Sequence, residues 1–176
     1  MPKFAVLRDL PASLTQSDLD GMAMEGLVAQ GLYPYCRTEE GDPGIAWVRT
    51  YWQPGSNWGM CFYEAPSAEE LWAFQASCGL EAVEIREVTE LRSPTGCDPG
   101  GEIAGSLNEA ELVAVEVPMS REDQGRPPEP GWIRTYWDEE RGRAVALYRA
   151  TDGPGLERAG RVHLPIVEVA ASAYRD

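Results

Sequence analysis

The largely apolar segment at residues 3–10 predicts a β-strand that ends at Pro11, with one face formed by Phe4, Val6 and Arg8 and the other by Ala5, Leu7 and Asp9. After this strand, apolar residues recur at helical spacing from Thr15 to Gly31, and the Thr15 hydroxyl can cap such a helix. The apolar face of the predicted helix consists of Leu19, Met22, Ala23 and Leu27. The chain is therefore expected to begin with a strand and a helix.

A β-hairpin and a second helix are predicted next. Residues 33–44 are rich in glycine, proline and acidic residues and should form a loop, whereas residues 45–52 and 58–64 have the composition of strands. A capping box that starts at Ser67 opens the helix, and Gly79 ends it. Its apolar face consists of Leu71, Phe74 and Cys78, and a last strand covers residues 83–91. This is the βαββαβ order of ferredoxin-like domains, in which both helices cover one face of a four-stranded sheet.

The sequence also contains an internal repeat. The hexapeptide at residues 47–52 (WVRTYW) returns 85 residues later at residues 132–137 (WIRTYW). The same spacing pairs Tyr63 with Tyr148, Ala65 with Ala150 and Leu71 with Leu156. Such a correspondence is typical of a copied domain. Two copies this short would have to bury their apolar faces against one another.

The second copy is predicted to be a shortened version of the first. Residues 111–117 should form its first strand, although a helix opened by Ser106 with Glu109 is a competing interpretation. Residues 120–131 are too short and too rich in proline to rebuild the first helix. The other elements are strands at 132–137 and 144–150 around a turn at 140–142, a short helix at 156–161 and a strand at 166–170. The repeats then cover residues 1–92 and 110–176, with residues 93–109 as the linker.

Charge and composition argue against several classes of protein. The 29 acidic and 15 basic residues give a net charge of −14, which disfavours nucleic acid and anionic membranes as partners. Arg8 and Asp9 break the only apolar stretch at the amino terminus, so neither a signal peptide nor a spanning helix is predicted and a cytoplasmic protein is expected. The four cysteines form no Cys-x-x-Cys pair and should be free thiols. The single histidine, His163, rules out a site of several histidines within one chain.

The repeated hexapeptides supply the candidate binding residues. Because alternate side chains of a strand share a face, each Trp-Arg-Tyr triplet should point away from the helices, toward a cavity between the two sheets. A few polar groups among aromatic side chains are typical of a small-molecule site. The six predicted ligand-binding residues are Trp47, Arg49, Tyr51, Trp132, Arg134 and Tyr136.

A structural role for the same residues is the alternative. A buried guanidinium group needs a counter-charge or an aromatic face. Internal acids could supply the counter-charge, and the aromatic side chains could then be part of the core. The candidate acids are Glu64, Glu84 and Glu116.

Four motifs occur together and in order: MPKF at 1–4 with RDLP at 8–11, IAWVRTY at 45–51, CFYEAP at 61–66 and IREV at 85–88. Together they resemble the family known as DUF4242, nickel-binding proteins with a ferredoxin-like fold, over most of residues 1–92. The second copy resembles the family only through residues 132–150 and weakly near 166–169.

This resemblance implies histidine ligands at positions where the chain has Arg49 and Phe74, with Arg134 and Arg158 in the second copy. Guanidinium groups do not bind a cation, so we expect no metal site and no cofactor. The wider superfamily pairs two such sheets into a dimeric α/β barrel. The resemblance therefore implies an α+β fold in which two ferredoxin-like βαββαβ repeats form a pseudo-dimeric α/β barrel, the second repeat lacking its first helix.

The sequence as a whole favours a cytosolic protein that binds a small molecule, anionic or aromatic in kind, between its repeats, as a monomer or weak homodimer. One alternative is a cofactor-independent enzyme of the monooxygenase, cyclase or isomerase type, in which arginine and tyrosine would stabilise an enolate or phenolate. No catalytic residue can be named for it. Binding of nickel or another divalent metal through glutamate and cysteine is the third interpretation.

Overall fold

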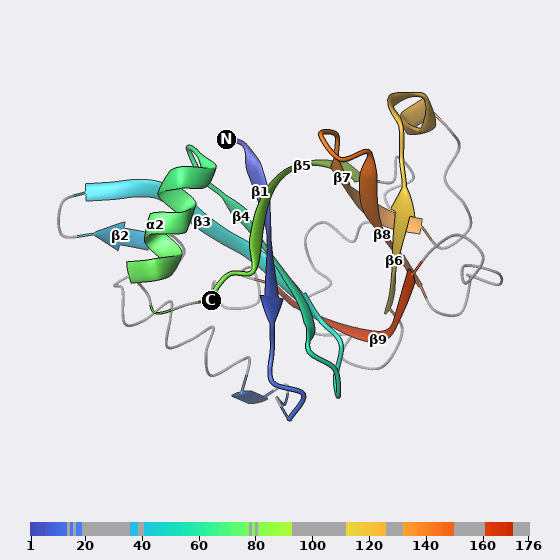
Figure 1. Cartoon of the computed structure of the whole chain (residues 1–176), viewed down its shortest axis with the longest axis horizontal. Helices are drawn as coiled ribbons and strands as arrows, with labels where there is room; N and C mark the ends of the chain where they lie inside the picture. The colour runs from blue at the N-terminus through green and yellow to red at the C-terminus, as the bar shows by residue number, and fades with distance from the viewer. Residues whose placement is uncertain are drawn as a thin grey trace. The chain divides into compact units, whose positions relative to one another are not determined.

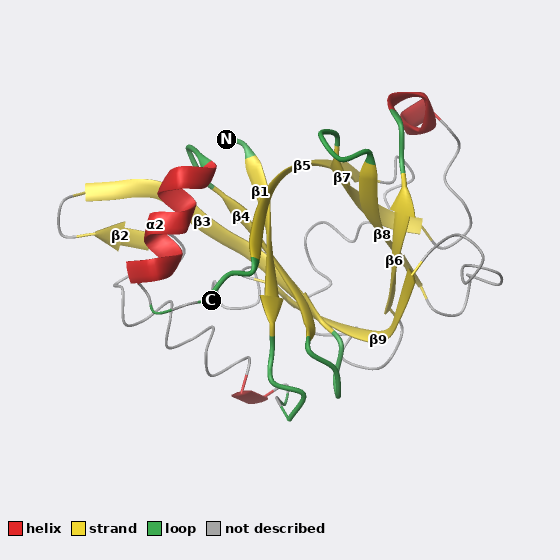
Figure 2. Cartoon of the chain, in the orientation of Figure 1, coloured by secondary structure: helices red, strands yellow, loops and turns green. Residues whose placement is uncertain are grey.

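A computed structural model describes residues 1–13, 15, 17–18, 36–38, 41–77, 79, 81–92, 112–125, 132–149 and 161–170. The chain divides into two compact units, Met1–Glu87 with Glu168–Asp176 and Val88–Val167. Figure 2 shows that strands dominate an α+β fold. No helix in the described part of the chain is long and apolar enough to cross a membrane.

The first unit is built on a sheet with the strand order β2-β3-β4-β1-β5. Strand β4 lies between β1 and β3 and runs antiparallel to both. The strands are β1 (Lys3–Asp9), β2 (Cys36–Thr38), β3 (Gly41–Trp52), β4 (Trp58–Glu64) and β5 (Glu84–Arg92). The last of these continues past Glu87 into the second unit.

Helix α2 (Ala68–Ser77) covers one face of this sheet (Figure 1). The Ser67 hydroxyl accepts a hydrogen bond of 3.1 Å from the Glu70 amide, and Gly79 has a left-handed φ of 67° just past the helix end. Both the predicted cap and the predicted stop are therefore confirmed. Leu71 is buried against the sheet, together with Phe4, Val6, Ile45, Cys61, Tyr63 and Ala65.

The second unit has the strand order β5-β7-β8-β6-β9. Its strands are β6 (Leu112–Pro118), β7 (Trp132–Asp138), β8 (Arg143–Arg149) and β9 (Arg161–Ala170). At the β7–β8 turn, the amide of Arg141 donates to Asp138 Oδ1 at 3.1 Å, and Gly142 adopts a φ of 61°. The short 3-10 helix η1 (Arg121–Gly125) follows β6.

The two units share one strand order. The series β3-β4-β1-β5 in the first unit corresponds to β7-β8-β6-β9 in the second, and both series follow the ferredoxin-like arrangement of second, third, first and fourth strand. The registers agree as well, since Val6 lies opposite Cys61 and Val115 lies opposite Ala146. Positions in the two units can therefore be compared residue by residue.

Most predicted strands are confirmed, and β6 shows that residues 112–117 form a strand rather than the competing helix. Two predictions are wrong. Residues 33–44 are not all loop, because β2 and the first part of β3 form a short antiparallel pair there. Strand β9 begins at Arg161 rather than at residue 166, so His163 lies in this strand. Pro165 obscured this strand, because proline within a sequence usually argues against a paired strand.

Several predicted segments lie outside the described residues. They are the part of the first helix beyond Asp18, the linker at 93–109 and residues 156–160 of the short helix predicted at 156–161. Where the first helix begins, the predicted cap is present, because the Asp18 amide donates to the Thr15 hydroxyl at 3.2 Å.

Gly59→Ala should lower the free energy of unfolding by about 1–2 kcal/mol, because a new Cβ must displace packed atoms. It would lie 2.3 Å from Leu10 Cδ1 and 2.9 Å from Leu10 Cγ, and Leu10 is buried. Urea unfolding measures the change. Ala144 occupies the equivalent position in the second unit, so Ala144→Val is the matched enlargement there. An unchanged midpoint for Gly59→Ala would contradict the close approach of Leu10.

Candidate functional site

A β-bulge interrupts the first hairpin within the repeated hexapeptide. Trp47 lies opposite Tyr63, but Arg49 lies opposite the very next residue, Phe62. Val48 is therefore an extra residue in β3 that has no partner position in β4. Because of this extra residue, the side chains that follow it change faces relative to a regular strand.

The bulge places Trp47 on the face that α2 covers. The Trp47 indole nitrogen donates to Thr50 Oγ1 at 3.1 Å, and the Thr50 hydroxyl donates to Cys61 Sγ at 3.0 Å. Cys61 and Tyr63 belong to the core under α2, and Trp47 packs against that core. We call this set, Trp47, Thr50, Cys61 and Tyr63, the tryptophan face of the first unit.

Arg49 and Tyr51 lie on the opposite face. Their partners in β4 are Phe62 and Met60, and the rings of Tyr51 and Phe62 meet edge to face at 5.8 Å and 75°. Arg49 is 6 % exposed and Tyr51 is fully buried. Arg49, Tyr51 and Phe62 form the arginine face of the first unit. The expectation that Trp47 shares this face is wrong, because it assumed a strand without a bulge.

The second hairpin repeats the bulge at the equivalent residue. Trp132 lies opposite Tyr148 and Arg134 lies opposite Leu147, which leaves Ile133 as the extra residue. The tryptophan-to-threonine hydrogen bond is also repeated, from Trp132 to Thr135 Oγ1 at 2.8 Å. The tryptophan face of the second unit is therefore Trp132, Thr135, Ala146 and Tyr148, and its arginine face includes Arg134, Tyr136 and Leu147.

The arginine face of the second unit contains a buried ion pair. Arg134 is 0 % exposed, and its Nη1 lies 3.3 Å from Glu90 Oε1 on β5. The register places Glu90 opposite Tyr136, which puts the carboxylate on this face. A buried guanidinium group needs such a counter-charge, because removing it from water is costly.

Two of the three acids that the sequence suggested as partners form ion pairs with other basic residues. Glu64 pairs with Lys3 at 3.7 Å, and Glu84 pairs with Arg86 at 2.5 Å. The sequence missed Glu90 because it lies on β5, and pairing between β5 and β7 does not follow from either repeat alone.

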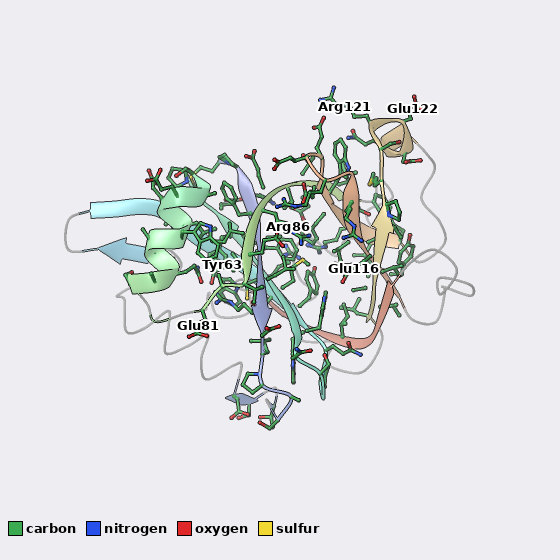
Figure 3. All side chains as sticks on the ribbon, in the orientation of Figure 1. Tyr63, Glu81, Arg86, Glu116, Arg121 and Glu122 are labelled. Atoms are coloured by element: carbon green, nitrogen blue, oxygen red, sulfur yellow. The ribbon has the colours of Figure 1, made fainter. Side chains whose placement is uncertain are left out.

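A second polar cluster lies on the tryptophan face of the first unit. Arg8 Nε donates to Cys61 Sγ at 3.3 Å, Nη1 donates to the Glu81 carbonyl at 2.7 Å, and Nη2 donates to Gln75 Oε1. Gln75 is 1 % exposed on α2. Figure 3 shows Tyr63 beside α2, and it shows Glu81 toward the lower end of this helix in that view.

This cluster changes the protonation equilibria of its members. Burial disfavours the charged guanidinium, but the Cys61 and Tyr63 side chains raise the pKa of Arg8 overall. For Tyr63, burial and the neighbouring Cys61 raise the pKa to about 12, against the opposing effect of Arg8. Tyr63 therefore stays neutral at physiological pH.

Sequence reasoning missed Arg8 and Gln75 as members of a cluster. Strand alternation correctly placed Arg8 on the same face as Phe4 and Val6. This placement was the available signal for a cluster, because a charged residue on an apolar strand face needs a partner. Gln75 gave no signal, since the apolar spacing of α2 predicted Phe74 instead as a buried residue.

A metal site requires several closely grouped donor side chains. Within the described residues, no three histidine, cysteine, aspartate or glutamate side chains are grouped closely enough to hold an ion. Arg49 and Phe74 stand where the family resemblance implies histidines. The described residues therefore do not fit a nickel site of that kind.

Comparisons with known proteins gave a family match in the first half of the chain and a similar solved structure. Residues 4–88 match a family described as "Nickel responsive protein SCO4226-like". A solved structure described as an anthrone oxidase-like protein aligns with 97 % of this chain and 93 % of its own, with 9 % identity and a TM-score of 0.40. No curated protein sequence matches the chain. The family match agrees with the nickel-binding resemblance found from the sequence.

Glu90→Gln should lower the free energy of unfolding by about 3 kcal/mol, because it leaves the Arg134 charge buried beside a neutral amide. Glu139→Gln removes the partner of the exposed Arg121 and should cost less than about 0.5 kcal/mol. Urea unfolding of both variants at neutral pH makes the comparison. Equal small losses would show that Glu90 does not neutralise Arg134.

Alkaline pH should destabilise the protein through Tyr63. Its pKa is about 12 in the folded chain against an ordinary value of 10.0, so the unfolded chain loses this proton first. The resulting stability is complete below pH 10 and is lost as pH rises toward 12, with a slope of up to about 1.4 kcal/mol per pH unit. Tyr63→Phe should remove this part of the slope when unfolding is measured between pH 9 and 11. A variant with the wild-type slope would contradict the assignment to Tyr63.

Proposed function

We propose that the protein is a cytoplasmic small-molecule-binding protein whose ligand is a small organic anion, aromatic in kind, held at an arginine face. The observation that carries this proposal is the repetition of a buried arginine and a buried tyrosine, two residues apart, at equivalent positions of both units. The protein is proposed to act as a monomer or weak homodimer.

Energetics support a functional origin for these residues. A sheet face that serves only for packing is usually at least as stable when it is apolar, because buried charges lose their hydration. Both units nevertheless retain arginine and tyrosine at these positions. The tryptophan faces behave differently, since Arg8 and Cys61 of the first unit correspond to Val117 and Ala146 of the second. Polar residues have thus been kept on the arginine faces and lost from one tryptophan face.

The chemistry of the side chains favours an anion with an aromatic ring. A guanidinium group presents N–H donors in a planar fork that matches a carboxylate. Tyr51 and Phe62 pack edge to face on the same side of the sheet as Arg49, so the surroundings of this guanidinium group are aromatic. The original six-residue set, which included Trp47 and Trp132, is narrowed to Arg49, Tyr51, Arg134 and Tyr136, because both tryptophans donate to threonines on the other face.

The architecture proposed for this function is a tandem duplication that forms a pseudo-dimeric α/β barrel. Its support is the ferredoxin-like strand order of each unit, together with strands β5 and β9, each of which has residues in both units. The repeated bulge and its tryptophan-to-threonine hydrogen bond also favour a common origin of the two hairpins.

A response to nickel is the second candidate, and the match of residues 4–88 to a nickel-responsive family is the observation that favours it. The described donor set does not fit such a site. We therefore place small-molecule binding first.

Binding should depend on the charge of the ligand and on Arg49. Isothermal titration with a panel of naphthoates and benzoates, each paired with its neutral carboxamide, should show binding of an acid and weaker binding of its amide. Arg49→Met should weaken binding of that acid by about 10- to 100-fold, the effect of losing one hydrogen bond to a charged group.

Arg121→Met is the matched control, because Arg121 lies exposed on η1 and should leave affinity unchanged (Figure 3). Circular dichroism must show that both variants are folded. Equal affinity of acid and amide, or wild-type affinity of Arg49→Met, would refute an anion site on the arginine face.

A further inference from the structure

We propose that the arginine face of the second unit contains an acid–base site, in which His163 takes a proton from a bound organic molecule and Glu116 is the carboxylate that orients the imidazole. The class of substrate is an aromatic or carbonyl compound with an acidic C–H bond. The site lies on one of the two arginine faces, but it adds a reaction to that face and does not require an anionic ligand. All of its residues belong to the second unit, Val88–Val167.

Strand β9 contains the only histidine of the chain, and the register of β9 with β6 decides which face that histidine occupies. His163 lies opposite Ala114, and Ala114 lies opposite Leu147 in β8. Leu147 in turn lies opposite Arg134 and belongs to the arginine face. Residues that lie opposite one another in antiparallel strands share a face of the sheet. His163 is therefore on the arginine face of the second unit.

Glu116 lies on the same face, two residues along β6 from Ala114. Its partner in β8 is Val145, which lies opposite Tyr136. His163 and Glu116 are thus diagonal neighbours on adjacent antiparallel strands. The Cα atoms of such neighbours are about 7–8 Å apart, a separation that long and aromatic side chains can bridge. The register therefore brings an imidazole and a carboxylate to one place on this face.

A β-bulge interrupts β9 directly after His163. Between Ala114 and Leu112, β6 advances by two residues, whereas β9 advances by three residues between their partners, His163 and Ile166. One residue of β9 in this interval is therefore extra. Pro165 is tolerated there because a bulge does not need every amide as a donor. Bulges are common beside active sites, where they change the direction of a side chain, and this one adjoins the only histidine.

The fold does not need a carboxylate at the position of Glu116. Leu7 occupies the equivalent position in the first unit. Glu116 is half-buried, and its neighbours on this face of β6, Leu112 and Ala114, are buried and apolar. Removing a carboxylate from water in such surroundings costs free energy unless a partner stabilises it. Packing alone would be satisfied by leucine, so the acid is a feature added to the second unit.

Two basic residues of β9 are neighbours of Glu116 in the register. Arg161 lies directly opposite Glu116, and His163 lies diagonally. A carboxylate has two oxygen atoms and can accept from two partners, so an arginine that keeps Glu116 ionised is compatible with an imidazole beside it. On β7 and β5, Arg134 and Glu90 form a buried ion pair of their own. An ionised Glu116 can therefore fix which nitrogen of the His163 ring carries the proton.

The proposed step is a proton transfer that needs no cofactor. The substrate C–H bond breaks, its electron pair stays on the substrate as an enolate-type anion, and an N–H bond forms on the His163 imidazole. Tyr136 shares this face, and its hydroxyl can donate to the oxygen of that anion. Return of the proton from the imidazolium to a different atom of the substrate completes an isomerisation.

Nitrogen NMR of the imidazole in the full chain tests the pairing, because the chain has one histidine and its signals are unambiguous. The neutral ring should be a single tautomer, held by the carboxylate. Glu116→Leu, which copies the first unit, should convert it to a mixture of both tautomers. The matched control is Glu122→Leu on η1, where Figure 3 shows Glu122 away from Glu116, and it should keep the wild-type spectrum. A tautomer mixture in the wild type, or an unchanged spectrum in folded Glu116→Leu, would overturn the proposal.

Proton transfer is measured with nitrobenzisoxazole, a two-ring aromatic probe. When a base removes its C–H proton, the electron pair of that bond forms the nitrile, the N–O bond breaks, and a coloured cyanonitrophenolate is released. The wild-type chain should release it at least about tenfold faster than His163→Gln, and Glu116→Leu should lower kcat by a few fold with KM unchanged. Circular dichroism checks that each variant folds.

Equal rates for the wild type and folded His163→Gln would show that His163 is not a base, and the proposal would fall. Neither the NMR spectrum nor the nitrobenzisoxazole rate involves an anionic ligand. Failure of this proposal is therefore distinguishable from failure of the anion binding that Arg49→Met tests.

Discussion

The repeated β-bulge at Val48 and Ile133 is the constraint on which the rest of the structure depends. One extra residue in the strand turns the tryptophan to the same face as the threonine three positions later, and the hydrogen bond between them holds the bulge in place. The arginine, which lies between this tryptophan and threonine, and the tyrosine, which follows the threonine, then point to the opposite face. Without the bulge, tryptophan, arginine and tyrosine would lie together on one face.

The two faces differ in how closely their residues agree between the two units. On the arginine faces both units keep a buried arginine and a buried tyrosine, and in the second unit Glu90 balances the charge of Arg134. On the tryptophan faces the first unit keeps Arg8 and Cys61, whereas the second has only apolar residues at these positions. Because the strand order is the same in both units, these differences reflect chemistry rather than folding.

The hydrophobic pattern predicted the hairpins, the cap of α2 and the strand order of each repeat, because alternation and capping are local properties of the sequence. It could not predict the bulge, since WVRTYW contains no glycine that would indicate an irregularity. It also placed Arg49 with Tyr51 correctly but assigned Trp47 to the wrong face. Glu90 and Gln75 were missed because their partners lie on strands distant in the sequence.

Native mass spectrometry of the purified full chain, paired with elemental analysis of the same sample, tests the central claim most directly. The account predicts an adduct with the mass of a small organic molecule, absent from Arg49→Met, and less than stoichiometric nickel. Nickel near one equivalent per chain, retained in Arg49→Met and without an organic adduct, would contradict it. That result would assign the function to residues other than the arginine faces.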